Sequence, residues 1–364
     1  MNICIPKERR DSEYRVGLTP AAVRLLHDAG HTCYIEHEAG LGSGFSDYDY
    51  QQAGGQIVYS GEEIYGRADF LIKVARPTQI EFDWMREGQI VAGFLHLAAG
   101  QSQKIEMLLE KKITAIGMEI IQDEDGTLPV MTPVSQAGGR MVAQVAATLS
   151  QNNFGGKGIL LGGVPGVPPA EVVILGGGTA GNAAARNFLG LGAAIYVLDR
   201  NLEVLRDLDR RFDGRVVTMV SHPFNIARVC RFADVLVGAV LIPGARAPIL
   251  VSREMVKSMR PRSVIIDLSI DQGGCIETSR PTTHSNPTYV EEEVVHYCVP
   301  NMTGVLGRTA THALNNASWP FIRLIAEIGL ENALELKPSL KHGLFTHQGE
   351  ILHERLQDSL KGRV

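Results

Sequence analysis

The chain has 364 residues, of which 45% are hydrophobic and 21% are charged. This composition excludes a disordered or fibrous chain, and the length exceeds what one hydrophobic core usually organises, so we expect about two globular domains. A formal net charge of -5 gives no basic footprint for nucleic acid, and a small-molecule partner is favoured.

The first third of the chain alternates short β-branched runs with helical patterns, as βαβ units over a parallel sheet do. The pattern predicts helices near residues 21–29 and 102–110, and strands at residues 2–5, 32–37, 69–74, 90–95 and 114–119. We assign this α/β segment, residues 1–134, to a first domain.

The middle of the chain predicts a second α/β domain over residues 135–305. The run SQAGGRMVAQVAATLS, which starts at Ser135, is typical of a helix with a serine N-cap, and we expect this helix to bridge the domains. Residues 155–169 are dense in Gly and Pro and indicate a loop. Six strands in a doubly wound pattern are expected after it, at residues 171–175, 194–198, 215–220, 234–239, 263–268 and 296–299.

Residues 306–364 return to helical sequence, for example at 310–328, and we expect them to pack on the first domain. No run approaches the roughly 20 apolar residues that span a bilayer, and the N-terminal residues lack the apolar region of a signal peptide. A cytoplasmic protein without a membrane partner is therefore expected. The five cysteines have no CxxC spacing, which argues against disulfides and a metal site, and we interpret them as buried small apolar residues.

The strongest motif is a glycine loop between the apolar run EVVIL and a helix of small residues. Gly176 permits the tight turn, Gly178 lets the backbone approach a pyrophosphate, and Gly181 allows the helix to pack closely on the strand. Thr179 and Ala180 complete the loop, where the helix N-terminus supplies N–H donors. The motif predicts a dinucleotide site, because strand, glycines and helix occur together.

Asp199 ends the next predicted strand, near where an acidic residue hydrogen-bonds the adenosine ribose hydroxyls. This position favours NAD over NADP. Arg200 follows the acid and is suited to a 2′-phosphate, so NADP stays an alternative. A second alternative is that Asp199 only caps the helix after it.

Three polar residues of the first domain follow strands, where ligands of open α/β sheets bind. Arg15 lies in the loop after the first strand, Lys73 ends the FLI run and His96 follows VAGFL, so we expect all three to face one cleft. They suit the reduction of a carbonyl to an amine or an alcohol. The arginine can bind a carboxylate with two N–H groups, the lysine is a movable charge, and the histidine titrates near neutrality. Taken singly, a solvated arginine, a snorkelling lysine and a satisfied core histidine are the ordinary alternatives.

Asp271 lies in the second domain between a strand and Gln272-Gly273-Gly274, near the expected nicotinamide position. A carboxylate there could hold ammonia or orient water, and a turn aspartate is an equal alternative. Asp267, inside the same apolar strand, has no clear role from the sequence.

Longer motifs resemble those of the alanine dehydrogenases. The soluble part of the proton-translocating nicotinamide nucleotide transhydrogenase belongs to the same family. The motifs are PKE with YRVGLTP, LGGVPGVPP, GAVLIPGA and IDQGGCIETSRPTTH, and the resemblance covers nearly the whole chain up to about Ile328. It implies reversible, NAD-dependent oxidative deamination of L-alanine to pyruvate and ammonia. It also implies a homo-hexamer in which a Rossmann domain for NAD is inserted in a split substrate domain.

The resemblance also implies residue roles. Arg15 and Lys73 would hold the substrate carboxylate and carbonyl, His96 would be the general acid/base, and Asp271 would support ammonia chemistry. Asn301 and Met302 would lie near substrate and nicotinamide. Besides the glycine loop and Asp199, the family's cofactor contacts map onto Ser135, Ser221, Val240 and Leu241.

The chain departs from the family pattern near the substrate. Phe94 and Met118 replace tyrosines, and Gln136 replaces a glutamate. Ala75 and Arg76 stand where the pattern Lys-Val-Lys-Glu-Pro has lysine and glutamate, and residues 303–308 read TGVLGR in place of Pro-Gly-Ala-Val-Pro-Arg. The loss of hydroxyl groups leads to the hypothesis that a larger or more apolar amino acid is preferred.

Three alternative functions stay open at this point. A transhydrogenase subunit would bind the same dinucleotide without amino-acid chemistry, and a catalytically silent NAD-binding regulator would explain the altered pocket. An opine-type dehydrogenase would couple pyruvate to an amine larger than ammonia. The presence of Lys73, His96 and Asp271 together favours an amino-acid substrate site.

Overall fold

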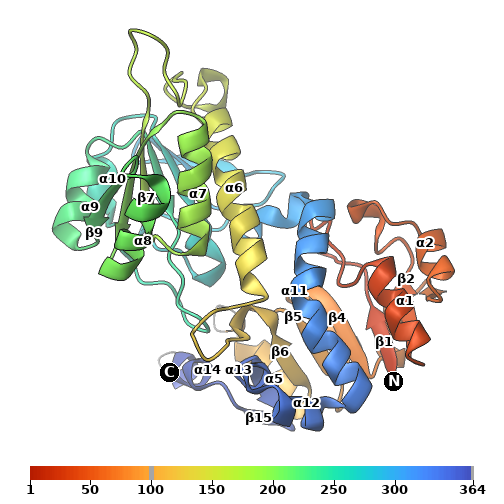
Figure 1. Cartoon of the computed structure of the whole chain (residues 1–364). Coiled ribbons are helices and arrows are strands. Elements are labelled where there is room, and N and C mark those ends of the chain that lie inside the picture. The colour runs from red at the N-terminus through yellow and green to blue at the C-terminus, as the bar shows by residue number, and fades with distance from the viewer. Residues whose placement is uncertain (98–101, 362–364) are drawn as a thin grey trace. The chain divides into compact units, whose positions relative to one another are not determined.

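The computed structural model describes residues 1–97 and 102–361. The chain forms two compact units (Figure 1): unit 1 contains residues 1–134, 243–245 and 303–364, and unit 2 contains residues 135–242 and 246–302. Each unit is built on its own, mostly parallel sheet with helices on both faces. The predicted α/β class with two parallel-sheet domains is confirmed.

The sheet of unit 1 has eight strands in the order β15-β14-β6-β5-β4-β1-β2-β3. The parallel strands are β1 (Asn2–Ile5), β2 (Thr32–Glu36), β3 (Gln56–Val58), β4 (Phe70–Ala75), β5 (Ile90–Phe94) and β6 (Thr114–Gly117). β14 (Leu344–His347) and β15 (Glu350–Ile351) extend the sheet in antiparallel fashion. All five strands that the sequence predicts in this unit are present, whereas β3, β14 and β15 were not predicted.

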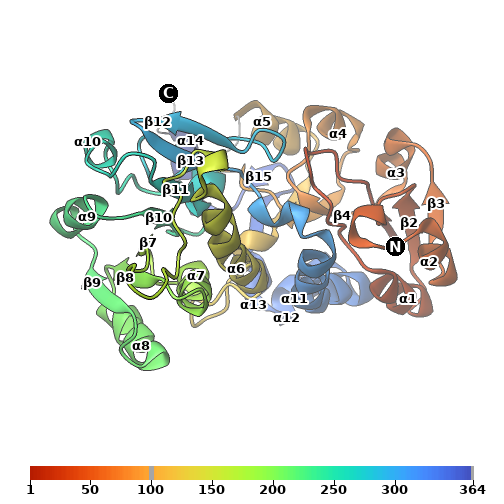
Figure 2. The same ribbon diagram turned by 90° about the horizontal axis from the view of Figure 1, so that it is seen from above.

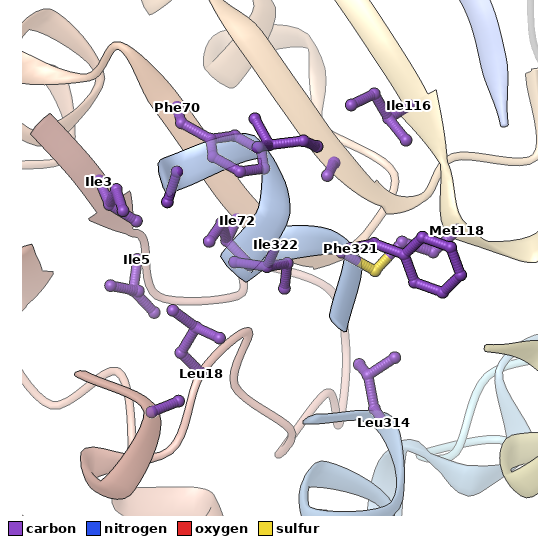
Figure 3. Packing of buried hydrophobic residues seen from close by; sticks show 14 of the residues in the cluster. Ile3, Ile5, Leu18, Phe70, Ile72, Ile116, Met118, Leu314, Phe321 and Ile322 are labelled. Atoms are coloured by element: carbon purple, nitrogen blue, oxygen red, sulfur yellow. The ribbon is translucent and has the colours of Figure 1, made fainter. Parts of the chain in front are cut away.

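Both faces of this sheet are covered, because successive strand residues point to opposite sides. Ile3 and Ile5 pack with α1 (Pro20–Asp28), α2 (Asp47–Gln52), α11 (Gly307–Ile328), α12 (Leu330–Leu336) and α13 (Pro338–His342). Cys4, between them, faces α3 (Gly61–Arg67), α4 (Gln79–Trp84), α5 (Ser102–Glu110) and α14 (Glu354–Lys361). Figure 3 shows Phe321 and Ile322 of α11 against the strand residues of the first face.

The sheet of unit 2 has seven strands in the order β12-β13-β11-β10-β7-β8-β9. The six predicted strands are confirmed. β7 (Glu171–Leu175) has the predicted bounds, and the ends are shifted in β8 (Ala194–Asp199), β9 (Val217–Val220), β10 (Val235–Gly238), β11 (Val264–Asp267) and β13 (Val294–Tyr297). β12 (Thr288–Glu291) adds an antiparallel edge. The strand order reverses at β7, between β8 and β10, which is where open α/β sheets bind their ligands.

Helices cover both faces of this second sheet as well. The helices α6 (Met131–Leu149), α7 (Thr179–Gly190) and α8 (Leu202–Phe212) pack on one face, and α9 (Pro223–Cys230) and α10 (Arg253–Lys257) on the other. Figure 2 shows α6 and α7 together on one side of the strands. Short 3₁₀ helices complete the described elements: η1 (Leu41–Ser43), η3 (Met118–Ile120), η4 (Asn152–Phe154), η5 (Leu268–Gln272) and η6 (Met302–Val305).

The serine N-cap predicted for α6 is wrong. The helix begins at Met131, so Ser135 lies inside it. Pro133 falls in the first turn, where its missing N–H has no intrahelical partner to lose. The five cysteines are buried, as interpreted. In the described part of the chain, no helix is both long and apolar enough to cross a membrane.

Candidate active site

Arg15 lies in the loop after β1 and is a buried cation, with 3% of its surface exposed. Its Nε and Nη2 donate to the two carboxylate oxygens of Glu13, each at 2.7 Å, and Nη1 donates to Thr303 Oγ1 at 3.3 Å. Such a two-point ion pair fixes the plane of the guanidinium. The solvated-arginine alternative is therefore wrong, and Arg15 is a pre-oriented cation of unit 1.

Lys73 is also fully buried, with none of its side chain exposed, so the snorkelling alternative is wrong. Its Nζ contacts Glu81 Oε1 at 2.7 Å and Glu8 Oε2 at 3.2 Å. The expectation of a movable charge is corrected by this geometry, because two carboxylates fix the ammonium. Burial alone would lower the pKa of Lys73, but these two carboxylates outweigh it and raise the pKa above its ordinary value.

Glu81 is the centre of this charged cluster. Its Oε1 also accepts the Tyr65 hydroxyl at 2.8 Å, and its Oε2 accepts the Thr78 backbone N–H at 2.6 Å as part of the capping box of α4. Burial opposes ionisation of Glu81, yet Lys73 and the hydrogen bonds from Thr78 lower its pKa to about 2. At Glu8 the effect of burial is larger than that of Lys73, and the pKa of Glu8 is raised. The cluster thus holds Lys73 charged in the interior of unit 1.

His96 follows β5 in an unusual backbone conformation, with φ at 42°. The Glu119 carboxylate accepts the backbone N–H of His96 at 2.6 Å and that of Leu95 at 3.1 Å. The His96 carbonyl accepts Nη1 of Arg76 at 3.2 Å. The ring is 18% exposed, and its Nδ1 lies 3.9 Å from Glu119, beyond hydrogen-bond distance. These contacts hold the backbone at His96 and leave part of the imidazole at the surface, unlike a core histidine.

The charges around His96 act on its protonation. Burial lowers the pKa of His96. The guanidinium groups of Arg76, Arg15 and Arg10 lower it further, against the opposing charge of Glu119. A neutral imidazole near neutral pH can accept a proton, which is what a general base requires.

Phe94 and Met118, two of the departures from the family pattern, are core residues of unit 1. They are 6% and 3% exposed and belong to the apolar cluster that contains Leu314 and Phe321. Met118 lies beside Phe321 in Figure 3. The apolar side chains suit these surroundings, since a buried hydroxyl would need a hydrogen-bond partner. Gln136, on α6, is exposed.

The glycine loop of unit 2 connects β7 to α7. Gly176 has φ at +100°, and a Cβ at Gly181 would lie 1.8 Å from the Gly176 carbonyl oxygen, so folding itself demands these two glycines. A Cβ at Gly178, the N-cap of α7, would meet no protein atom within 4 Å. Thr179 and Ala180 open the helix. The space over Gly178, beside the helix N-terminus, suits a phosphate group.

Asp199 ends β8 and faces this loop. Its Oδ2 accepts the Gly177 N–H and its Oδ1 accepts the Asn201 N–H, each at 2.8 Å. The side chain that caps α8 is Asn201, so the alternative role of Asp199 as a helix cap is wrong. The carboxylate joins the glycine loop to β8, at the site where adenosine ribose hydroxyls bind in such folds.

The other predicted cofactor residues of unit 2 lie on several elements. The Ser221 N–H donates to the Asp199 carbonyl at 2.9 Å. Ser269 Oγ accepts the Val240 N–H at 3.0 Å and donates to the Val240 carbonyl at 2.9 Å, so Ser269 holds that loop. Leu241 and Arg200 are exposed, and Ser135 is half-buried. No described contact joins these residues into one cluster.

Asp271 lies in η5 at the carboxyl end of β11. Its Oδ1 accepts the Asn301 N–H at 3.0 Å, and Asn301 has φ at 58°. The structure therefore brings these two predicted residues together, with Met302 buried next in the chain. Asp267 has a structural role, because its carboxylate accepts the N–H groups of Ser269 and Cys275. Burial raises the pKa of Asp267.

Sequence reasoning missed the acidic partners of the predicted site: Glu8, Glu13, Glu81 and Glu119. A sequence does not distinguish a buried carboxylate from a surface one. One signal existed, since Thr78 and Glu81 have the spacing of a capping box. Within the described ranges, His, Cys, Asp and Glu side chains form no group of three suited to a metal ion.

Known proteins match the chain over nearly its whole length. Residues 4–138 match the N-terminal domain, and residues 142–354 the C-terminal domain, of the family described as alanine dehydrogenase/PNT. An alanine dehydrogenase of Methanococcus maripaludis is 49% identical over 97% of this chain and 95% of its own length. An alanine dehydrogenase of Mycobacterium tuberculosis is 44% identical over 99% of this chain and 97% of its own length.

Solved structures agree with these sequence matches. An L-alanine dehydrogenase superposes with a TM-score of 0.90 at 44% identity, covering 100% of both chains. A transhydrogenase from Sinorhizobium meliloti has a TM-score of 0.78 at 24% identity over 97% of this chain and 99% of its own, and shares the fold. The chain therefore belongs to the alanine dehydrogenase/PNT family.

Proposed function

We propose that this protein is an NAD-dependent alanine dehydrogenase, which converts L-alanine and water to pyruvate and ammonia and catalyses the reverse reaction. The observation that carries the proposal is the full-length similarity to alanine dehydrogenases, at up to 49% identity among the relatives described. The ordered Arg15, Lys73 and His96 of unit 1 support it, as does the glycine loop of unit 2.

The residues of unit 2 fit NAD. The open space over Gly178 beside the N-terminus of α7 suits the pyrophosphate, and the Asp199 carboxylate suits ribose hydroxyls while repelling a 2′-phosphate. Arg200 is exposed and does not contact Asp199 among the described ion pairs. NAD held at this loop would supply the acceptor for the hydride of the substrate Cα. We propose Ser135, Ser221, Val240 and Leu241 as further contacts.

The protein's own residues take the remaining roles. Arg15 binds the substrate carboxylate, and His96, kept neutral by burial and nearby cations, takes a proton during oxidation. Water then adds to the imine carbon. Lys73 stabilises the oxygen that develops there, and Asp271, with Asn301 beside it, binds the nitrogen that leaves as ammonia.

Three finer points accompany the proposal. The substrate domain is assigned to unit 1 and the cofactor domain to unit 2. A homo-hexamer and a cytoplasmic location are proposed from the family resemblance, and light scattering of the purified protein tests the first. The hypothesis that a larger or more apolar amino acid is preferred rests on the loss of hydroxyl groups at Phe94 and Met118 in the sequence, since both side chains lie in the core of unit 1.

The first experiment mixes purified protein with NAD and L-alanine and follows nicotinamide absorbance, with NADP in parallel and pyruvate, NADH and ammonium for the reverse reaction. Turnover with NAD supports the proposal. A panel of amino acids tests specificity, and the hypothesis of a larger substrate fails if alanine has the highest kcat/KM. NAD binding without turnover on any amino acid would instead indicate a regulator.

Two substitutions test the roles in catalysis. His96→Ala and Asp271→Asn should each lower kcat about 100-fold or more, because each removes a group that handles protons or nitrogen in the reaction. NADH affinity, measured by fluorescence, should stay nearly unchanged. Near-normal turnover in either variant would remove that residue from the mechanism.

A further inference from the structure

The backbone at His96 is held from two sides. Its left-handed φ of 42° is uncommon for a residue other than glycine and needs support from its surroundings. Glu119 provides part of that support by accepting the N–H groups of Leu95 and His96. Arg76 provides the other part by donating to the His96 carbonyl at 3.2 Å. The general base of the proposed reaction thus depends on contacts with a carboxylate and a guanidinium.

We propose that Arg76 is a positioning residue for His96: it holds the His96 carbonyl and places a fixed positive charge near the imidazole. This inference rests on the proposed function, in which His96 accepts the proton. The family resemblance assigns no role to this position, where the related pattern has a glutamate.

The location of Arg76 supports a fixed charge. Arg76 follows β4, the neighbour of β5 in the sheet, and Ala75 pairs with Phe94, two residues before His96. Its own carbonyl accepts Nε of Arg10 at 3.0 Å, and the buried Pro77 restricts the backbone after it. Arg76 is half-buried, so its charge is less screened by solvent than a surface charge would be.

The largest charge effects on His96 come from four groups in the described part of the chain. Arg76 lies after β4, Arg10 and Arg15 lie in the loop after β1, and Glu119 lies in η3. Three cations face one carboxylate, and together with burial they lower the pKa of His96. Removal of one cation must raise that pKa, so His96 would become protonated at a higher pH.

The main experiment compares Arg76→Gln, Arg76→Glu and Arg76→Lys in amino-acid oxidation over a range of pH. For the Gln and Glu variants we expect kcat/KM to fall at least threefold more at about pH 6 than at about pH 9, since the base is then protonated earlier. The Lys variant keeps the charge and should keep the wild-type profile. An unchanged profile in Arg76→Glu would overturn the proposal.

The matched control is Arg86→Gln. Arg86 lies in the same unit and also donates to a backbone carbonyl, that of Ala68, at 2.9 Å, but it is not among the four charges with the largest effect on His96. Its profile should stay that of the wild type. If the pH profile of kcat/KM in Arg86→Gln shifts as it does in Arg76→Gln, the loss of any arginine bound to a backbone carbonyl is enough to cause the shift. That result would also overturn the proposal.

A second readout needs no turnover. Diethyl pyrocarbonate modifies neutral imidazole, and the ring of His96 is 18% exposed, so its modification rate against pH can be followed in the full-length protein by peptide mass spectrometry. In Arg76→Glu the midpoint of that rate should move to higher pH. If turnover fails but the midpoint moves, the proposed function is wrong and the role of Arg76 stands. If turnover occurs and the midpoint does not move, only the role of Arg76 is wrong.

Discussion

At the scale of single residues, the site of unit 1 depends on buried ion pairs. Lys73 contacts two carboxylates, and Arg15 pairs with Glu13 at two points. Removal of one partner of a buried pair costs about 3 to 5 kcal/mol, because the other charge is left without compensation. The fold therefore needs each of these residues, as does the proposed reaction. A loss of activity alone does not separate the structural role from the catalytic one.

Glu81→Gln should lower the free energy of unfolding by about 3 kcal/mol near neutral pH. The pKa of Glu81 falls from 4.5 to about 2 in the folded protein, so its ionisation contributes stability above pH 4.5. That contribution is lost as the pH falls from 4.5 towards 2, and the difference between variant and wild type should narrow over that range. Urea unfolding of both proteins at a series of pH values measures this difference in the free energy of unfolding.

The control for this prediction is Glu63→Gln. Glu63 pairs with Arg67 four positions later on α3, where both side chains are 45% exposed. Such surface pairs contribute about 0.5 kcal/mol or less. A Glu81 variant that behaves like the Glu63 variant, or that loses the same stability at every pH, would contradict the account of the buried cluster.

The sequence predicts the side chains that we propose for catalysis better than it predicts their partners. Arg15, Lys73 and His96 follow strands, and the rule that ligands bind at strand ends finds them. Glu119 binds two backbone N–H groups from a separate 3₁₀ helix, and nothing in its local sequence indicates that contact. The pairing depends on which strands become neighbours, which a single sequence does not state.

At the scale of elements, the β7–loop–α7 segment contains glycines that the fold requires and one, Gly178, that we propose a ligand requires. Gly181→Ala should destabilise unit 2 by about 3 kcal/mol, because the new Cβ would lie 1.8 Å from the Gly176 carbonyl oxygen. Gly178→Ala should change the stability by less than about 0.5 kcal/mol, since no protein atom lies within 4 Å of the new Cβ.

The same pair of variants tests the cofactor site. Gly178→Ala should weaken NADH binding, because the methyl group occupies the space proposed for the pyrophosphate. Thermal unfolding and NADH fluorescence titration measure the two effects separately. An alanine at Gly178 that leaves both stability and NADH affinity unchanged would remove this loop from the cofactor site.

Elements buried on both faces were the easiest to predict. β11 is apolar over most of its length and packs between two clusters, which is the pattern of a central parallel strand. β12 carries threonine and glutamate at an edge, and β15 has only 2 residues, so neither shows that pattern. The start of α6 was misplaced because serine is a common N-cap residue, whereas Ser135 lies inside the helix.

At the scale of the whole molecule, each unit has its own hydrophobic clusters. The two clusters of unit 2 draw only on residues 142–302, and those of unit 1 only on residues outside that range. Unit 1 is built from both ends of the chain, since β14 pairs with β6 and α11 packs with β1 and β4. Unit 2 is inserted in the sequence of unit 1 because strands and helices far apart in the chain pack together. The periodicity of the sequence does not reveal these long-range contacts.

A fragment of residues 131–302 should therefore fold without the rest of the chain. It contains α6, the complete seven-stranded sheet and both of its apolar clusters, so each face of the sheet is covered. We expect one cooperative thermal transition by circular dichroism and NADH affinity within about tenfold of the intact protein. We expect no alanine oxidation, because Arg15, Lys73 and His96 are missing.

The same fragment with Asp199→Ala is its control. That carboxylate accepts the Gly177 N–H and is proposed to bind the ribose, so the control should fold but bind NADH more weakly. A fragment that shows no cooperative transition would mean that unit 2 depends on unit 1 for its stability. A folded fragment that binds no NADH would place part of the cofactor site outside residues 131–302, and the assignment of NAD binding to unit 2 alone would then be wrong.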